Sequence, residues 1–218
     1  LMEGLSHEAS SLAGHLGLSK LIVFFDDNSI SIDGSTELSN SEHTMKRYES
    51  YGWDSISIDG HNHLEISQAI IEAKKNKKPT IIACKTKIGF GSPNKESKSS
   101  SHGSPLGEDE IKLTRKNLNW NYNNFEIPDD MLSKWRSFAE KNKAIRQNWI
   151  EKNANTISSK KYKDFFSKNL SDEIIDKLKE FKNKHFKEKT NCASRKASET
   201  AIEFFSSELD NLVGGSAD

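Results

Sequence analysis

Three strand-like segments, separated by stretches with helical spacing, place the strongest constraint on how this chain can fold. They are LIVFF at 21–25, WDSISI at 53–58 and TIIAC at 80–84. The first is a continuous apolar run, which is typical of a strand buried on both faces of a parallel sheet. Strands that alternate with helices in this way indicate an α/β fold with a parallel sheet and right-handed crossovers.

Helical spacing of apolar residues accounts for most of the remaining chain. One stretch is different, because residues 91–107 are rich in Ser, Gly and Pro and almost free of apolar side chains. A loop of this length inside a compact domain is usually functional or disordered. The helices that we expect lie at 6–16, 43–51, 64–75, 108–118, 129–152, 172–187 and 195–208, with a last strand at 211–215.

The chain has 218 residues, a length that allows one or two domains. Because the segment around 153–190 is rich in Lys, Asn and Ser, we interpret it as a linker that carries a helix. We therefore expect a first domain over 1–157, a linker over 158–190 and the beginning of a second unit over 191–218. The chain opens at Leu1 in mid-pattern and stops directly after an expected strand, so we expect an interior fragment of a longer protein.

The charge composition argues against two classes of partner. Lys and Arg together number 32, and so do Asp and Glu, so the formal net charge is zero. Nucleic acids and anionic membrane surfaces attract proteins with a basic excess, so we expect neither as a partner. No apolar run is long enough for a membrane-spanning helix. Cys84 and Cys192 lie far apart and in no metal-binding spacing, which is typical of reduced thiols in the cytoplasm.

Polar residues follow directly on the first expected strand. The sequence DDNSISIDG at 26–34 places Asp26, Asp27 and Asn28 where ligands bind in open α/β sheets, beyond the carboxyl end of a strand. Asn28 offers a neutral side-chain oxygen, and the chain beyond it turns, so a carbonyl near Ile30 can face the same point. Such oxygens suit a hard cation like Mg²⁺. The alternative is that Asp27 and Asn28 merely cap the strand end, and spacing alone favours that alternative.

Beyond these patterns, the sequence resembles the transketolase family. Residues 1–34 are similar to the thiamine-diphosphate motif of that family, which opens with Gly-Asp-Gly and closes at an Asn; the opening Gly-Asp-Gly would precede Leu1. Each further motif is modest alone, but the ordered set covers nearly the whole chain and separates transketolases from other thiamine enzymes. In the family's order these motifs are YGW at 51–53, DGHN at 59–62, KTKIGFGSPNK at 85–95, HGSPLG at 102–107, SRKAS at 194–198 and GGSAD at 214–218.

The resemblance implies a thiamine-diphosphate-binding fold. Residues 1–157 would form the C-terminal part of its diphosphate-binding domain, and 191–218 would begin a similar pyrimidine-binding domain. The resemblance also reverses the preference at the first strand: Asn28 is similar to the side-chain ligand of Mg²⁺ (or Ca²⁺), and Ile30 to the ligand that binds through its main-chain carbonyl. An aspartate upstream of Leu1, the cofactor diphosphate and a water would complete the metal shell.

Two residues of the region after the third strand resemble ligand contacts. His102 is similar to a histidine that touches the diphosphate side of the cofactor and the substrate hydroxyls and stabilises the reacting intermediate. Without the resemblance, a histidine in a loop is most often a surface residue. Ile88 is similar to an apolar contact of the thiazolium region, with an ordinary core residue as the alternative.

Four more residues take roles from the resemblance. Glu3 and Glu8 are similar to acids that link two active sites across a subunit interface, although acids that open a helix are also favourable to its dipole. Arg195 is similar to the arginine that forks onto the substrate phosphate, with an arginine on a helix face as the alternative. Asp218 is similar to an acid that approaches the cofactor from the partner subunit.

The activity that the resemblance implies is ketol transfer. A transketolase moves a two-carbon ketol unit from a ketose phosphate to an aldose phosphate in the pentose phosphate pathway, as a homodimer with thiamine diphosphate and a divalent cation. The alternatives are another thiamine enzyme, such as a deoxyxylulose-phosphate synthase or a dehydrogenase E1 component, and a non-catalytic partner subunit. The sequence departs from the family at Ser99, where many relatives carry a second histidine, and at 35–44, where many carry a tryptophan. Because the activating glutamate would lie beyond Asp218, we expect the fragment alone to be inactive.

Overall fold

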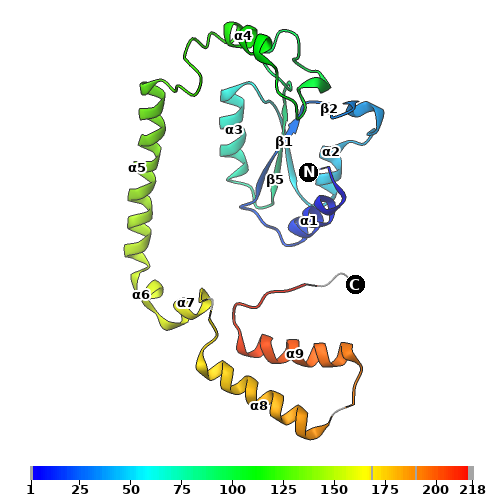
Figure 1. Cartoon of the computed structure of the whole chain (residues 1–218), viewed down its shortest axis with the longest axis vertical. Helices are drawn as coiled ribbons and strands as arrows, with labels where there is room; N and C mark the ends of the chain where they lie inside the picture. The colour runs from blue at the N-terminus through cyan, green and yellow to red at the C-terminus, as the bar shows by residue number, and fades with distance from the viewer. Residues whose placement is uncertain (1, 168, 190, 216–218) are drawn as a thin grey trace. The chain divides into compact units, whose positions relative to one another are not determined.

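The computed structural model describes residues 2–167, 169–189 and 191–215. The chain divides into two compact units, Leu1–Glu126 and Ile127–Asp218. In Figure 1, a sheet with helices on both faces belongs to the first unit, and the described part of the second unit is drawn as helices joined by loops. A compact unit is a stretch that packs against itself, which is a different division from a domain of the family. The expected domain boundaries at 157 and 190 therefore stay predictions.

A parallel sheet forms the centre of the first unit. Its strands are β1 (Ile22–Asp27), β4 (Asp54–Asp59) and β5 (Thr80–Lys85), in the order β1-β5-β4. Both neighbours of β5 run parallel to it. The predicted α/β class and the parallel sheet are therefore confirmed. A short antiparallel hairpin, β2 (Ile30–Ser31) with β3 (Gly34–Ser35), follows β1 where the sequence predicted only a turn.

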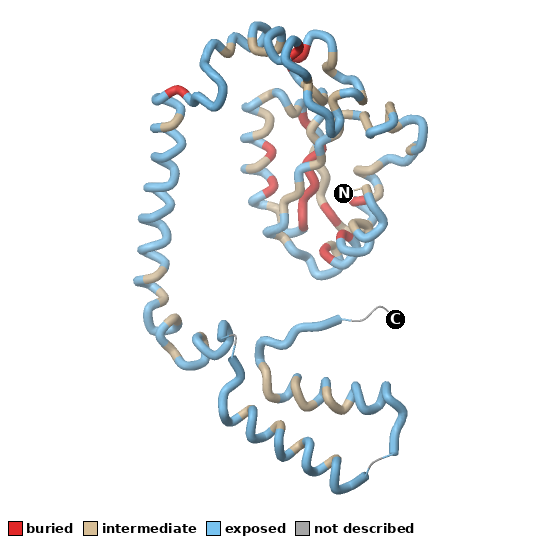
Figure 2. Tube along the Cα trace, in the orientation of Figure 1, coloured by how far each residue is buried: buried red, intermediate tan, exposed pale blue. Residues whose placement is uncertain are grey.

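Helices cover both faces of this sheet. Helices α1 (Gly4–His15) and α2 (Thr44–Ser50) lie on one face, and α3 (His63–Ala73) lies on the other (Figure 1). Successive residues of a strand point to opposite faces, so Ile81 of β5 joins one buried cluster and Ile82 joins the other. Both are fully buried, and each contributes about 1.5–3 kcal/mol of hydrophobic free energy. Figure 2 shows buried positions in the sheet and in the helices that cover it.

The YGW motif joins α1 to the end of α2. Trp53 is buried, its indole N–H donates to the Ser10 carbonyl at 2.8 Å, and its ring meets that of Tyr48 edge to face at 5.2 Å. A side chain at Gly14 would collide with the Tyr51 carbonyl, since a Cβ there would lie 1.8 Å from that oxygen. The motif therefore has a packing role that fixes α1 against the sheet.

A long loop leaves β5 and ends at α4 (Glu108–Asn117). It contains a single turn of 3-10 helix, η2 (Ser99–Ser101). The predicted loop at 91–107 thus exists, and it is folded on itself by hydrogen bonds that are described with the site.

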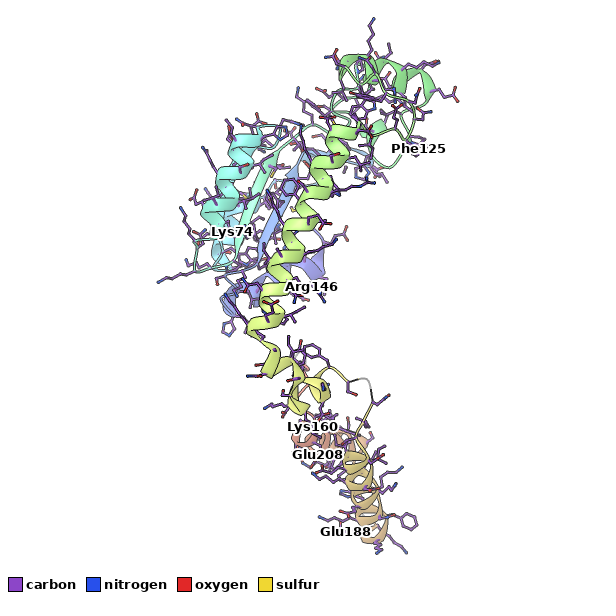
Figure 3. All side chains as sticks on the ribbon, turned by 90° about the vertical axis from the view of Figure 1, so that its left-hand side faces the viewer. Lys74, Phe125, Arg146, Lys160, Glu188 and Glu208 are labelled. Carbon is purple, nitrogen blue, oxygen red and sulfur yellow. The ribbon has the colours of Figure 1, made fainter. Side chains whose placement is uncertain are left out.

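The second unit consists of helices in its described residues. They are α5 (Asp129–Lys152), α6 (Ala154–Ser158), α7 (Lys160–Phe165), α8 (Asp172–Glu188) and α9 (Ser194–Glu208). Figure 3 shows side chains projecting from all around α5, with Arg146 on its C-terminal half. Helices α8 and α9 contact each other through the stacked rings of Phe181 and Phe204, whose centroids are 4.6 Å apart.

The strand predicted at 211–215 is wrong. Residues 212–215 have no regular structure, and Val213 is 89% exposed. A strand needs a neighbour for its backbone hydrogen bonds, and no strand is present among the described residues of the second unit. No described helix is both long enough and apolar enough to cross a lipid bilayer.

Candidate functional site

The carboxyl ends of the three parallel strands meet at one edge of the sheet. Asp27 of β1 and Asp59 of β4 both lie beside Lys85 of β5. Ligands of open α/β sheets bind at this edge. The segments that leave β1 and β5 here carry four of the predicted site residues, namely Asn28, Ile30, Ile88 and His102.

The two acids before Asn28 belong to the strand itself. The sequence predicted a strand ending at Phe25, but β1 continues through Asp27. The backbone of β5 pairs with both residues, and each carboxylate has a partner at the end of β5: Lys85 forms an ion pair with Asp27, and the hydroxyl of Thr86, the next residue, donates to Asp26. These acids therefore hold the ends of β1 and β5 together.

Asn28 and Ile30 share one tight turn beyond β1. The Asn28 side-chain oxygen accepts a hydrogen bond from the Ile30 N–H at 3.0 Å, and its amide nitrogen donates to Asp26 at 3.3 Å. Ser29 between them has a φ of 61°, the left-handed conformation that reverses the chain. An amide oxygen has two acceptor positions, so one stays available for a ligand.

This donor set fits a hard cation. Neutral amide and carbonyl oxygens are ligands that Mg²⁺ and Ca²⁺ accept. Among the described residues, no group of three or more His, Cys, Asp or Glu side chains could hold a metal ion. The oxygens of Asn28 and Ile30 stay the predicted metal ligands.

The DGHN motif shapes the neighbouring strand end. Gly60 lets β4 approach β5 closely, and its N–H donates to the Lys85 carbonyl at 2.8 Å. Asn62 caps α3 by accepting from the N–H of Leu64 at 3.0 Å. His61 accepts from the Lys87 N–H at 3.0 Å. None of these roles was predicted, and the only signal in the sequence is the motif itself.

The loop after β5 starts against this motif and folds back on itself. Phe90 stacks on the His61 ring with centroids 4.1 Å apart. Ile88 is half-buried, and its carbonyl accepts from the Ser97 N–H at 2.8 Å. His102 follows η2, is exposed, and donates its backbone N–H to the Ser99 carbonyl at 2.8 Å. One folded loop thus carries both predicted contact residues and leaves His102 accessible.

Two carboxylates fix the shape of this loop. Glu96 accepts from the Gly91 N–H and from the Lys87 ammonium, both at 2.9 Å. The Gly91 bond is the main reason that the pKa of Glu96 lies below its ordinary value, and Lys87 adds to the effect. The second carboxylate is Glu110 of α4, which is buried. Sequence patterns do not single out either acid, because their partners are loop residues without periodicity.

The other predicted residues are not brought to this edge by contacts in the structure. Glu3 precedes α1 and Glu8 lies within it, and both are exposed. Glu3 makes no side-chain capping bond. Arg195 is exposed in the first turn of α9, in the second unit. Asp218 lies outside the described residues.

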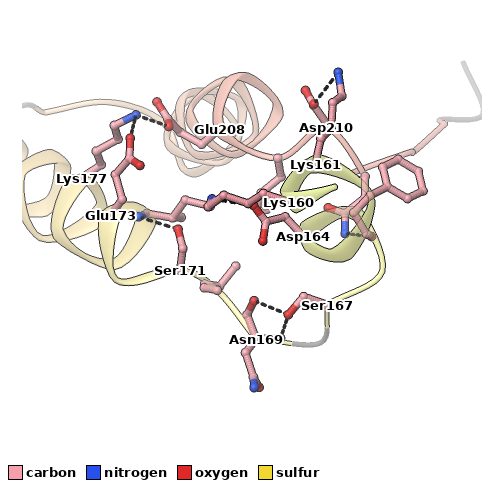
Figure 4. Close-up of a pocket in the computed structure, with 15 residues that line it drawn as sticks. Lys160, Lys161, Asp164, Ser167, Asn169, Ser171, Glu173, Lys177, Glu208 and Asp210 are labelled. Atoms are coloured by element: carbon pink, nitrogen blue, oxygen red, sulfur yellow. Dashed lines mark hydrogen bonds and ion pairs between the residues drawn. The ribbon is translucent and has the colours of Figure 1, made fainter. Parts of the chain in front are cut away.

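A hollow of about 670 Å³ in the second unit has a different character. It lies among α7, the start of α8 and the residues after α9, and none of the predicted site residues lines it (Figure 4). Its cations already have partners: Lys177 lies 2.8 Å from Glu208 and 3.2 Å from Glu173. The hydrogen bond with Glu208 is the largest reason that the pKa of Lys177 is raised. The lysines that line the hollow are thus paired with carboxylates of the same unit.

A family model and curated relatives that match this sequence are named for transketolase. Residues 1–179 match the family "Transketolase, thiamine diphosphate binding domain". A transketolase of Buchnera aphidicola (subspecies Schizaphis graminum) is 46% identical over the full length of this chain, and one of Sinorhizobium medicae is 38% identical. The chain spans 34% and 31% of these two relatives, or about a third of their length.

Solved structures agree. A transketolase of Campylobacter jejuni matches 77% of this chain, and 27% of its own, with a TM-score of 0.71 and 34% identity. A transketolase of Pichia stipitis in complex with sedoheptulose-7-phosphate matches 76% of this chain, and 24% of its own, with a TM-score of 0.66 and 42% identity. The family match covers most of the chain, and the parallel sheet is of the same fold. This chain therefore belongs to the transketolase thiamine diphosphate binding domain family.

Proposed function

We propose that this chain is part of a transketolase that transfers a two-carbon ketol unit from a ketose phosphate to an aldose phosphate. One observation carries the proposal: Asn28 and Ile30 share a turn at the carboxyl end of β1 in a chain that matches transketolases along its whole length. The sugar-phosphate substrate class is supported by the Pichia stipitis relative, which was solved with sedoheptulose-7-phosphate.

The turn after β1 would hold the metal. Asn28 would bind Mg²⁺ (or Ca²⁺) through its side-chain oxygen and Ile30 through its main-chain carbonyl, so that the cation ties the cofactor diphosphate to the sheet edge. When bound, thiamine diphosphate supplies the electron sink for breaking and forming the carbon–carbon bond. Ile88, half-buried on the neighbouring loop, would contact the thiazolium region.

His102 would act as a hydrogen-bond donor toward the cofactor diphosphate and the substrate hydroxyls. Its imidazole is exposed, while its backbone is fixed by the bond to Ser99, so the side chain can reach a ligand from a defined position. A positioned donor that follows developing charge stabilises a transition state. This supports a catalytic role for His102.

The remaining assignments concern the substrate phosphate and the subunit interface. Arg195 would fork onto the substrate phosphate, Glu3 and Glu8 would lie at the interface of a homodimer, and Asp218 would approach the partner's cofactor. The domain division at 157 and 190 and a cytoplasmic location belong to the same proposal. Exposed Arg195, Glu3 and Glu8 are available for such contacts.

The test compares two asparagines in the protein expressed from its complete reading frame. Both Asn28 and Asn40 accept a backbone N–H two residues ahead at 3.0 Å, so Asn40→Ala removes the same kind of turn bond without touching the proposed metal site. We expect Asn28→Ala to weaken Mg²⁺-dependent thiamine diphosphate binding, measured by calorimetry, by at least about tenfold, or about 1.4 kcal/mol. Asn40→Ala should bind as wild type.

Ketol transfer itself is measured with pentose phosphates, and pyruvate serves as the comparison donor. A wild-type protein that uses pyruvate and not ketose phosphates would refute the proposed reaction. Equal cofactor binding by Asn28→Ala and wild type would remove the metal assignment.

A further inference from the structure

A buried carboxylate on α4 binds the loop that carries Ile88 and His102. Glu110 is 8% exposed and accepts three hydrogen bonds from that loop. Its Oε1 accepts from the Ser92 hydroxyl and from the Asn94 N–H at 2.9 Å, and its Oε2 accepts from the Asn94 side-chain amide at 2.9 Å. We call these three bonds the Glu110 anchor.

The anchored residues lie at the centre of the loop's own hydrogen bonds. Ser92, besides donating to Glu110, accepts from the Lys95 N–H at 3.2 Å. Lys95 then spans the loop: its ammonium donates to the Leu106 carbonyl at 2.8 Å, and its carbonyl accepts from the Ser101 hydroxyl at 2.6 Å. The hydrogen bonds that begin at Glu110 thus end at Ser101 and Leu106, which flank the segment 102–105 that contains His102.

The chemistry of the anchor demands a carboxylate. A buried acid is costly unless its oxygens are hydrogen-bonded. Glu110 meets this condition with donors alone, and these bonds lower its pKa, chiefly the one from Ser92 and then those from Asn94, with Lys95 as a nearby cation. A glutamine has one acceptor oxygen and two N–H donors, so it cannot accept from both sides as the carboxylate does.

Neighbouring acids on the same helix have no such role. Glu108 and Asp109 open α4 and are exposed, and Asp109 pairs only with Lys112 at the surface, at 3.0 Å. All three acids are equally favourable to the N-terminal end of the helix. The burial and the three loop bonds of Glu110 therefore need a reason beyond the helix.

We propose that Glu110 is a positioning residue for the proposed ketol-transfer reaction: it holds the 86–107 loop in the shape that presents His102 and Ile88 to the cofactor and substrate. This rests on the proposed function for the roles of those two residues. The Glu110 anchor itself is a set of hydrogen bonds in the structure and does not depend on the proposed function.

The first test measures the loop without any activity. Trypsin cuts after lysine, and Lys95 and Lys98 lie inside the loop. We expect Glu110→Gln to speed cutting at these two sites by about tenfold, because the loop then opens more often. Asp109→Asn, which removes an equal charge one residue away, should leave the cutting rate unchanged. Glu110→Asp, which keeps the carboxylate, should restore part of the protection.

The second test measures the reaction in the protein from its complete reading frame. Glu110→Gln should lower the turnover number by about 10-fold to 100-fold, as expected for a misplaced catalytic group. If Glu110 acts through His102, the same change in a His102→Ala background should have little further effect. A purely structural loss would lower turnover by the same factor in both backgrounds.

The outcomes separate the two proposals. Unchanged cutting in Glu110→Gln would refute the anchor, and faster cutting with unchanged turnover would refute its positioning role. Wild-type protein without ketol transfer would refute the proposed function and with it the positioning role, while the trypsin result would still decide the anchor.

Discussion

Adding one methyl group at Gly60 should separate the end of β4 from the end of β5, beside the candidate site. A Cβ at this position would lie 2.4 Å from Cγ2 of Thr86, 2.9 Å from Cβ of Cys84 and 3.0 Å from the Lys85 carbonyl oxygen. Carbon atoms in contact prefer about 3.5–4.0 Å, so the nearest pair must open by about 1 Å. Gly60→Ala therefore forces a rearrangement where β4 leaves the sheet.

The loss of folding stability in Gly60→Ala depends on which neighbouring group moves. Thr86 can rotate its methyl group aside, but its hydroxyl then loses the hydrogen bond to Asp26. Otherwise the strands move apart and strain the bond from the Gly60 N–H to the Lys85 carbonyl, now 2.8 Å long. Overpacking of this kind costs about 1–3 kcal/mol. At a few degrees per kcal/mol, the midpoint of thermal unfolding should fall by about 3 to 12 °C.

Circular dichroism during heating measures this midpoint, and two variants serve as controls. Gly4→Ala adds the same methyl group in α1, where a Cβ would meet nothing within 4 Å, so it should be neutral or slightly stabilising. Adding Thr86→Ser to Gly60→Ala removes the nearest carbon and keeps the hydroxyl, and should recover part of the loss. A Gly60→Ala protein as stable as wild type would refute the close approach of the strand ends.

Three further predictions concern the proposed reaction and the loop. His102→Ala should lower turnover by about 100-fold and weaken Mg²⁺-dependent cofactor binding much less, and unchanged turnover would remove its catalytic role. Arg195→Ala should raise KM for phosphorylated sugars by about 10-fold to 100-fold, and equal effects on unphosphorylated sugars would contradict phosphate binding. The pKa of Glu110 is lowered, so the anchor stabilises the fold above the ordinary carboxyl pKa and is lost as pH falls through the lowered value. The difference in unfolding midpoint between wild type and Glu110→Gln should therefore shrink on acidification, and a constant difference would contradict this.

The sheet could be predicted from the sequence because its signal is local. The run at 21–25 is apolar throughout, and stretches with helical spacing separate it from the runs at 53–58 and 80–84. The fold class and the succession of strands and helices along the chain follow from this periodicity. The end of β1 could not be predicted in this way. Asp26 and Asp27 belong to the strand because the backbone of β5, more than 50 residues later, pairs with theirs, and Thr86 and Lys85 also bind their carboxylates.

The predicted strand at 211–215 failed for a related reason. Its apolar pair, Leu212 and Val213, suits a strand, but a strand exists only when another strand shares its backbone hydrogen bonds. The described residues of the second unit offer none. Local composition thus predicts the capacity to form a strand, and the partner decides whether it forms.

The site residues also differ in whether a local sequence signal or a contact with distant residues determines their position. The position of Asn28 follows from the fold alone, since it comes directly after a strand of a parallel sheet. Glu110 and Glu96 follow from no pattern, because each binds a loop whose residues are ordered by side-chain contacts. Arg195 was singled out by resemblance, and nothing in the geometry of α9 distinguishes it from other exposed cations.

The topology of the sheet explains why residues distant in sequence can act together here. Parallel strands place all their carboxyl ends at one edge, so the turn with Asn28, the Gly60 corner and the loop with Ile88 become neighbours without any local signal between them. Topology brings these segments only within range of each other. The Gly60 approach and the Glu110 anchor then fix the strand ends and the loop on the scale of a hydrogen bond, which is the scale that a metal or a proton donor requires. Substitutions at Gly60 or Glu110 should consequently impair the site while leaving the three-stranded sheet recognisable.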